Sequence, residues 1–418
     1  MRAGRIRQLA IDITPLRRSR DFRLLWFGEM VSQVGSMITL VALFVQVYDL
    51  TNSAFAVGLI GLIQLGPMLL VSLFLGPEID RRDRRKLLLI AQTGLMGASV
   101  LLLLGAHLDN PPLALIYGAA ALNAGFTSLS MPTRSAMTPN MVGTDLLPQA
   151  SALNQVMWNG AQVIGPAVGG VVVARAGLTW AYGIDVVSYV AALVAVIALR
   201  PQPPQRADGE EVETGFAAIR TALRFLKGKP VLQSTFTVDI VAMVFGMPRV
   251  LFPVLAVQQF HRGAEVVGWL FSAVAFGAVL AALSSGWVRR VRRCGLAILV
   301  AVGVWGIAIA AFGLVGDNLA LALVCLAIAG GADVISAVFR NTVQQLVVPD
   351  SLRGRMSAFN IFVVAGGPRV GDVEGGLVAS AFTPMASVVS GGLLCVAGVA
   401  VIALCVPRFA RWRIGDPA

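Results

Sequence analysis

The pattern of apolar residues along the chain predicts an all-α membrane protein. Long stretches nearly free of Lys, Arg, Asp and Glu recur, and each is close to the roughly 20 residues that a helix needs to cross about 30 Å of hydrocarbon. The stretches are continuous rather than alternating, which favours helices over a β-barrel. We predict twelve transmembrane helices, at residues 22–48, 55–76, 87–106, 112–133, 149–174, 178–199, 231–258, 265–288, 295–315, 318–340, 355–381 and 385–406.

Composition and charge support this interpretation. Of the 418 residues, 57% are hydrophobic and 13% are charged, and the mean hydropathy of +0.78 is too high for a soluble fold. The net charge of +11 would fit a nucleic-acid ligand, but most basic residues fall in segments that an even number of crossings places with the N-terminus. This assignment puts Arg134 and Arg340 in or near the loops after the fourth and tenth helices. The exceptions are Arg175, Arg249, Arg262 and Arg369.

The positive-inside rule then indicates the orientation of the chain. We expect a multi-pass protein of the inner (cytoplasmic) membrane with both termini in the cytoplasm. The lipid bilayer is its predicted surroundings, no nucleic acid is expected as a partner, and the protein is expected to be a monomer.

The two halves of the chain carry matching short segments at a nearly constant spacing. Val57-Gly58 and Val267-Gly268 are 210 residues apart, and Gly165-Pro166 and Gly367-Pro368 are 202 apart; residues 151–154 and 357–360 match at 206. Such a repeat predicts two pseudo-symmetric six-helix bundles with a substrate site between them. We expect bundles at 1–199 and 229–418, joined by a cytoplasmic linker at 200–228 that contains an amphipathic helix.

The segment 76–86, between the second and third helices, is the most informative motif. It holds a glycine, an Asp-Arg pair and further basic residues, and it resembles the signature loop of the major facilitator superfamily. The matching residues are Gly76, Asp80, Arg81, Arg84 and Arg85. The resemblance implies the twelve-helix fold of that superfamily and a conformational latch, in which glycine allows close helix approach and Asp80 accepts hydrogen bonds. The alternative is a plain basic anchor on the cytoplasmic side.

A second motif lies in the fifth helix. Gly165, Pro166, Gly169 and Gly170 resemble the core of the motif associated with antiporters in this superfamily. Proline removes a backbone hydrogen bond and the glycines thin the helix, so it can bend and pack closely. Ordinary small-residue packing is the alternative.

Three further segments, 247–253, 348–355 and 367–372, resemble the enterobactin-exporter-like branch of the superfamily. The resemblance implies a secondary active exporter that works by alternating access and exchanges protons for a siderophore or a hydrophobic drug. It implies a small-molecule substrate, a proton gradient as the energy source, and no cofactor or metal. A transporter of another substrate class, such as a lipid-like molecule or a metabolite, by uniport or import, is the alternative.

Ionisable residues within the predicted helices are costly, by roughly 3 kcal/mol on insertion scales, and therefore indicate function or pairing. Carboxylates suit proton coupling, and the candidates are Glu29, Asp239 and Asp333. Other polar and charged groups suit substrate binding or gating, and the candidates are Gln33, Arg249, Arg369 and Asp372. Arg369 and Asp372 stand three residues apart on one helix and are expected to pair in part. Structural ion pairs are the alternative for all of these carboxylates.

Enzymatic and ATP-driven functions lack support in the sequence. It contains no Gly-x-Ser-x-Gly elbow, no His-Glu-x-x-His metal site and no Walker loop. A receptor or scaffold would not need so many charges within the membrane. We therefore expect a transporter rather than an enzyme.

Overall fold

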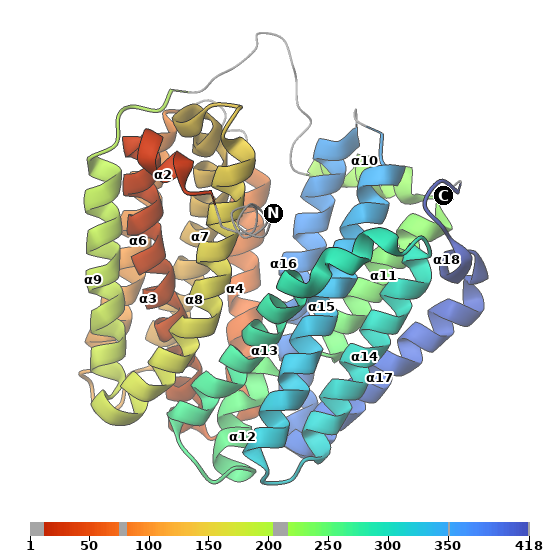
Figure 1. Ribbon diagram of the computed structural model, residues 1–418. Helices are drawn as coiled ribbons and strands as arrows, with labels where there is room; N and C mark the ends of the chain where they lie inside the picture. The colour runs from red at the N-terminus through yellow and green to blue at the C-terminus, as the bar shows by residue number, and fades with distance from the viewer. Residues whose placement is uncertain (1–11, 75–81, 204–215, 350–351, 417–418) are drawn as a thin grey trace, which may run out of the picture.

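The computed structural model describes residues 12–74, 82–203, 216–349 and 352–416, and these residues form helices with no β-strand among them (Figure 1). The first bundle consists of α2 (Thr14–Arg18), α3 (Arg20–Thr51), α4 (Ala54–Phe74), α6 (Arg84–Gly105), α7 (Leu113–Val142), α8 (Leu147–Ala176) and α9 (Leu178–Ile197). The second consists of α10 (Phe216–Leu226), α11 (Pro230–Phe245), η1 (Arg249–Leu251), α12 (Phe252–Gln258), α13 (Ala264–Ser284), η2 (Ser285–Arg290), α14 (Cys294–Leu314), α15 (Leu319–Val347), α16 (Arg353–Ala381), α17 (Pro384–Cys405) and α18 (Pro407–Arg411).

The prediction of a twelve-helix membrane protein is confirmed. Within the described ranges, eleven helical segments are long and apolar enough to cross a membrane. The twelfth crossing is α16, whose 29 residues include Arg369, Asp372 and Glu374, so its apolar character is weaker. Large apolar side chains remain exposed on the surface of the bundles, among them Val187, Leu283 and Ile307, as expected for helices that face lipid.

Two crossings are longer than the sequence pattern predicts. The helix α7 continues nine residues past the predicted end at 133, and α15 continues seven past 340. Apolar patterning stops at the first polar turn, but the backbone continues helically until Gly143, whose φ of +74° ends α7. The assignment of Arg134 and Arg340 to loops is therefore wrong, because both lie inside helices.

The seventh crossing is broken near its centre. The prediction of one run over 231–258 becomes α11, the 3-10 turn η1 and α12. Pro248 and Pro253 have no backbone N–H to continue the helical ladder. The Trp305 Nε1 group donates a 2.8 Å hydrogen bond to the Gly246 carbonyl at the break. The break places Arg249 on an irregular turn inside the protein, where its side chain can reach a neighbouring helix.

The two bundles meet mainly towards the end remote from α2, α10 and α18, and they diverge towards the end that carries these helices (Figure 1). Contact is made along two helix pairs, α4 with α16 and α8 with α13. A Cβ added at Gly170 of α8 would lie 2.6 Å from the Ala264 carbonyl oxygen and 3.0 Å from the Gly268 Cα. Ser272 of α13 donates a 2.7 Å hydrogen bond to the Val163 carbonyl of α8. Glycine therefore allows backbone-to-backbone packing between the bundles.

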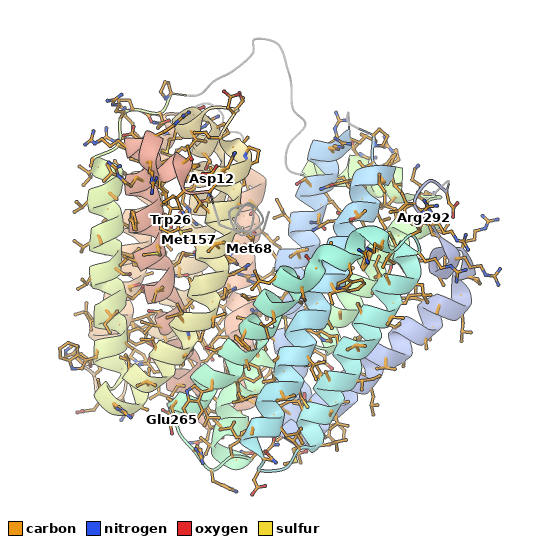
Figure 2. The ribbon with its side chains drawn as sticks, viewed as in Figure 1. Asp12, Trp26, Met68, Met157, Glu265 and Arg292 are labelled. Carbon is orange, nitrogen blue, oxygen red and sulfur yellow. The ribbon has the colours of Figure 1, made fainter. Side chains whose placement is uncertain are left out.

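Charged side chains mark the two ends of the bundles. In Figure 2, Arg292 lies towards the end of the second bundle that carries α18, whereas Glu265 lies at the opposite end. Between these ends the sticks are mostly carbon, and the few buried charges within this layer form the candidate site.

We predict that Gly170→Leu destabilises the protein by about 1–3 kcal/mol, the usual cost of overpacking. The added side chain has to displace the backbone of α13. The matched control is Gly160→Leu in the same helix, where no atom lies within 4 Å of an added Cβ. Unfolding in detergent should separate the two variants, and equal stability of both would contradict the close packing of the bundles.

Candidate functional site

A buried ion pair joins α3 and α7 in the first bundle. An Arg134 Nη1 donates to Glu29 Oε2, and Gln92 Nε2 of α6 donates a 2.7 Å hydrogen bond to Glu29 Oε1. The Glu29 side chain is 5% exposed and that of Arg134 is 16% exposed. Both carboxylate oxygens therefore have donors, and one acid is matched by one base.

A buried cluster joins α11 and α15 in the second bundle. Arg340 Nη2 lies 2.8 Å from Asp239 Oδ1 and 3.9 Å from Asp333 Oδ1, and Arg340 Nη1 donates to Ser336 Oγ at 3.0 Å. The Asp239 and Arg340 side chains are 3% and 7% exposed, whereas that of Asp333 is 32% exposed. Two carboxylates therefore share one guanidinium.

These two sites are related by the internal repeat. Asp239 follows Glu29 by 210 residues and Arg340 follows Arg134 by 206, the offsets that relate the matching segments of the halves. Each pair joins the first crossing of its bundle to the fourth. The two sites differ in their further residue, because the first adds the neutral Gln92 from α6 and the second adds Asp333 from α15, the helix that also carries Arg340. The first site is thus neutral, and the second carries one excess negative charge when all its groups are ionised.

A third ion pair lies where α4 meets α16. Arg249 of η1 donates from Nε to Asp372 Oδ1 at 2.8 Å and from Nη2 to Asp372 Oδ2 at 2.6 Å. This two-pronged geometry is the strong form of an arginine–carboxylate interaction. Asp372 is 1% exposed, so its charge depends on Arg249 for compensation.

Glycines of the first bundle make room for this pair. A Cβ at Gly61 would lie 2.7 Å from Asp372 Oδ2, and one at Gly58 would collide with the Asp372 carbonyl. By the repeat offset of 202, Asp372 occupies the position that Gly170 has in the first half. The two equivalent contacts between bundles therefore differ. The helix α8 meets α13 glycine to glycine, whereas Gly58 and Gly61 of α4 pack on Asp372, whose ion pair with Arg249 lies within the second bundle.

The expected pairing of Arg369 with Asp372 needs correction. Both Asp372 oxygens accept from Arg249, whereas Arg369 Nη1 donates to the Ala365 carbonyl of its own helix at 2.6 Å. The Arg369 Nε is buried and has no hydrogen-bond partner among the described residues. The break in the seventh crossing places Arg249, rather than Arg369, against Asp372, and helical spacing within one helix does not predict this contact.

Gln33 is partly buried on α3, and no side-chain hydrogen bond is found for it within the described ranges.

Asp185 of α9 is a fully buried carboxylate with a different environment. Thr39 and Ser99 donate to its Oδ2 at 2.8 and 2.6 Å, and Ser188 Oγ lies 3.3 Å from its Oδ1. Within the described part of the chain, no basic side chain lies within ion-pair distance of it. A Cβ at Gly35 would lie 2.7 Å from Asp185 Oδ1, so glycine leaves room for the acid. Hydroxyl groups can donate or accept, so this cradle can satisfy either protonation state.

The signature loop is only partly visible. Gly76, Asp80 and Arg81 lie outside the described residues. Arg84 Nη1 donates to the Ala136 carbonyl of α7 at 3.0 Å, and Arg85 Nη2 donates to the Ile197 carbonyl at the end of α9 at 2.6 Å. These two arginines therefore tie the start of α6 to neighbouring helices of the first bundle.

The glycine and proline motif of α8 packs in two directions. Gly165 and Gly169 face α3, where an added Cβ at Gly169 would lie 2.9 Å from the Ile38 Cα. Gly170 faces α13, and the Pro166 carbonyl lies against Gly268 of that helix. The motif thus holds α8 against its own bundle and against the partner bundle.

Residues 10–413 match the family described as transmembrane secretion effector. The chain belongs to this family, within the major facilitator superfamily. It is 31% identical over 412 residues to the enterobactin exporter EntS of Citrobacter koseri and 29% identical over 411 residues to that of Salmonella typhi, each match covering 97% of both chains. This membership makes the protein a transporter rather than an enzyme.

Solved structures support the fold of this transporter. A POT family transporter in complex with a thioalcohol-conjugated peptide has a TM-score of 0.75 at 11% identity, covering 93% of this chain and 96% of that one. A bacterial homologue of the iron transporter ferroportin has a TM-score of 0.67 at 16% identity, covering 94% and 98%.

The sequence analysis of this transporter did not identify the two arginines that pair with Glu29 and Asp239. Arg134 and Arg340 were counted among the basic residues of loops, although their spacing of 206 repeats the spacing of the matching segments. A search for charged residues that recur in both halves at the repeat spacing would have found two acids, Glu29 and Asp239, and two arginines, Arg134 and Arg340.

We predict strong coupling between Glu29 and Arg134. Glu29→Gln or Arg134→Gln alone leaves one buried charge without its partner and should cost about 3–5 kcal/mol of unfolding free energy. The double variant removes both charges and should cost clearly less than the sum. Unfolding in mixed micelles tests this, and additive losses would show that the pair is not an energetic unit.

Proposed function

We propose that the protein exports a siderophore across the cytoplasmic membrane, in exchange for protons, by alternating access of its two bundles. The observation that carries the substrate class is the similarity, over 97% of both chains, to proteins named enterobactin exporter. The distribution of basic residues supports cytoplasmic termini. With that orientation, bundles that meet at the remote end correspond to a state that opens towards the cytoplasm.

The cluster of Asp239, Asp333 and Arg340 is the proposed proton site. One guanidinium compensates one carboxylate, and a second ionised carboxylate beside it is costly in a low-dielectric interior. The cluster can therefore hold one proton without leaving Arg340 unpaired. Asp333 is the more exposed acid, with 32% of its side chain accessible, and is the proposed group that exchanges protons with water. Glu29 would strand Arg134 if it were protonated, so we assign it a structural role.

Arg249 and Asp372 are the proposed gate at the remote end. Their ion pair lies against Gly58 and Gly61 of α4, so α4 cannot leave α16 without exposing Asp372. Separation of the bundles at this end would hydrate both charges and compensate part of the lost contact. Arg369 and Gln33 remain the proposed substrate contacts, because the Arg369 Nε is without a partner and a siderophore can present anionic oxygens.

Export of a hydrophobic drug is the second candidate. A groove of about 760 Å³ between α3, α8 and α9 supports it. Trp26, Met30, Met157 and Trp180 line this groove, and none of its described lining residues is charged. Aromatic and methionine side chains adapt to varied apolar ligands.

Transport into inverted membrane vesicles with an imposed pH gradient tests the proposal. We expect uptake of a catecholate siderophore that stops when the gradient is collapsed, and little uptake of a macrolide. Macrolide uptake without siderophore uptake would favour the second candidate. Siderophore transport that ignores the gradient would contradict proton exchange.

Asp333→Asn should reduce gradient-driven uptake to the level of vesicles without the protein, because Asp239 then remains paired with Arg340 and no carboxylate needs a proton. The matched control is Asp317→Asn, an exposed acid just before the same helix, which should transport normally. Normal coupling in Asp333→Asn would exclude this residue as the proton carrier.

The gate predicts an accessibility change at the remote end. Ala54 is 7% exposed and its carbonyl lies against Gly376 of α16. In a Cys405→Ser background, an Ala54→Cys side chain should be protected from an impermeant maleimide added outside. Adding Asp372→Asn should increase labelling, because Arg249 loses its partner and is better hydrated in the open state. Asp49→Asn, an exposed acid, is the control, and unchanged labelling in Asp372→Asn would contradict the gate.

A further inference from the structure

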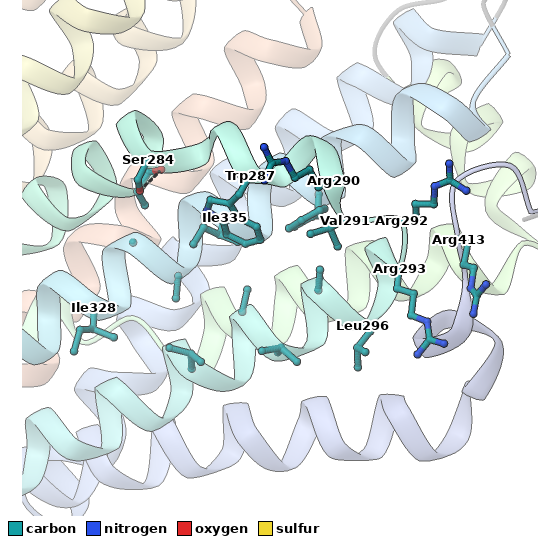
Figure 3. Close-up of a pocket in the computed structure, with 18 residues that line it drawn as sticks. Ser284, Trp287, Arg290, Val291, Arg292, Arg293, Leu296, Ile328, Ile335 and Arg413 are labelled. Atoms are coloured by element: carbon teal, nitrogen blue, oxygen red, sulfur yellow. Dashed lines mark hydrogen bonds between the residues drawn. The ribbon is translucent and has the colours of Figure 1, made fainter.

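A groove of about 930 Å³ lies on the second bundle between α13, α14 and α15, at the end that carries α18 (Figure 3). We propose that this groove binds an anionic phospholipid, with the phosphate at a cluster of four arginines and an acyl chain in an apolar trough. We call the four arginines that line the groove the arginine cluster. Arg292, Arg293 and Arg413 lie towards one end, and Arg290 lies beside Trp287. The trough consists of Leu296, Val300 and Val304 of α14 with Ile328 and Ile335 of α15.

The fold holds the arginine cluster together from two distant parts of the chain. Arg290 ends η2, and Arg292 and Arg293 form the short link to α14. Arg413 comes from the segment after α18, where the Ile414 backbone N–H donates to the Arg292 carbonyl at 3.0 Å. The Phe409 carbonyl of α18 packs directly on Gly295, so only glycine permits this docking. The cluster is therefore a built feature and not a chance meeting of two basic loops.

Among the described residues, the structure shows no ion pair for the arginine cluster. All four side chains are exposed, and no carboxylate of the described residues lies within 4 Å of their guanidinium groups. The nearest acid in the segment, Asp416, accepts instead from the Arg413 backbone N–H at 2.9 Å. Like charges along one groove repel one another, and an anion bound between them reduces that repulsion. Phosphate suits several guanidinium groups at once.

The trough provides an apolar surface on which an acyl chain can lie. Leu296, Val300 and Val304 follow one another at four-residue intervals, so they form one stripe of α14 about 12 Å long. Their exposed fractions of 41%, 57% and 40% leave this stripe open. Figure 3 shows Arg292, Arg293 and Arg413 near one end of the groove and Ile328 towards the other.

Basic, aromatic and apolar side chains follow one another along the groove in the order of the headgroup, interface and acyl chain of a membrane lipid. Trp287, a side chain type common at the membrane interface, lines the groove beside the arginine cluster, and the trough continues below it along helices that cross the membrane. Basic pockets between transmembrane helices on the cytoplasmic side are suited to anionic headgroups. A free phosphate would use the arginine cluster only, whereas a phospholipid would use both parts.

Native mass spectrometry of the full chain in detergent tests the proposal. The probes are phosphatidylglycerol, phosphatidylcholine and glycerol 3-phosphate. We expect phosphatidylglycerol to bind about tenfold more tightly than phosphatidylcholine, a difference of about 1.4 kcal/mol. Glycerol 3-phosphate, which has no acyl chain, should bind much more weakly. Equal binding of the two lipids, or equal binding of glycerol 3-phosphate, would overturn the proposal.

Variants distinguish lipid binding in the groove from nonspecific attraction of anionic lipid to the other basic residues of this end. The triple change Arg290→Gln, Arg293→Gln and Arg413→Gln should remove the preference for phosphatidylglycerol. The matched control neutralises three exposed arginines elsewhere, Arg17, Arg220 and Arg224, and should keep the preference.

Val300→Trp fills the trough without changing charge and should weaken binding of both lipids. Size-exclusion profiles identify any variant that misfolds, and an Arg290→Lys, Arg293→Lys and Arg413→Lys variant should retain part of the preference. Loss of the preference in the control triple, or full lipid binding in a folded Val300→Trp variant, would overturn the proposal.

Discussion

Burying an ionised side chain away from water costs several kcal/mol unless an opposite charge and hydrogen bonds compensate it. Three buried acids of this transporter have a basic side chain within ion-pair distance, and a fourth, Asp185, is held by hydroxyl donors instead. Glu29 has Arg134 and Gln92, Asp239 has Arg340, and Asp372 has Arg249. At the Arg340 cluster, Asp333 is the acid in excess, because the arginine it approaches already lies closer to Asp239.

The internal repeat explains the two acid–arginine pairs but not the excess acid, because Thr127 stands at the position that corresponds to Asp333 at the offset of 206. Duplication supplies each bundle with an acid on its first crossing and an arginine on its fourth, and the resulting pair stabilises the packing of both. The third members come from different positions, Gln92 from α6 and Asp333 from α15, and they leave the first site neutral and make the second able to hold a proton. The contacts between the bundles also differ, with Gly170 at one and Asp372 at the other.

Much of the fold could be predicted from the sequence because crossing a membrane imposes length and composition on each helix. The twelve crossings and the two bundles follow from that constraint and from the repeat. The ends of α7 and α15 could not be predicted from hydropathy, because a buried arginine looks like a loop residue until its acidic partner is known. The pairing of Arg249 with Asp372 depends on the break after Phe245 and on contacts across 123 residues, which local spacing does not encode.

The excess carboxylate at Arg340 is the central claim, and infrared difference spectroscopy between acidic and alkaline pH measures it most directly. A protonated carboxyl group has its own C=O stretching band, separate from that of a carboxylate. We predict that the acid-minus-alkaline spectrum contains such a band, that Asp333→Asn removes a component of it, and that Glu29→Gln leaves it unchanged. A band that keeps its full size in Asp333→Asn and shrinks in Glu29→Gln would contradict the assignment of the proton to the second bundle.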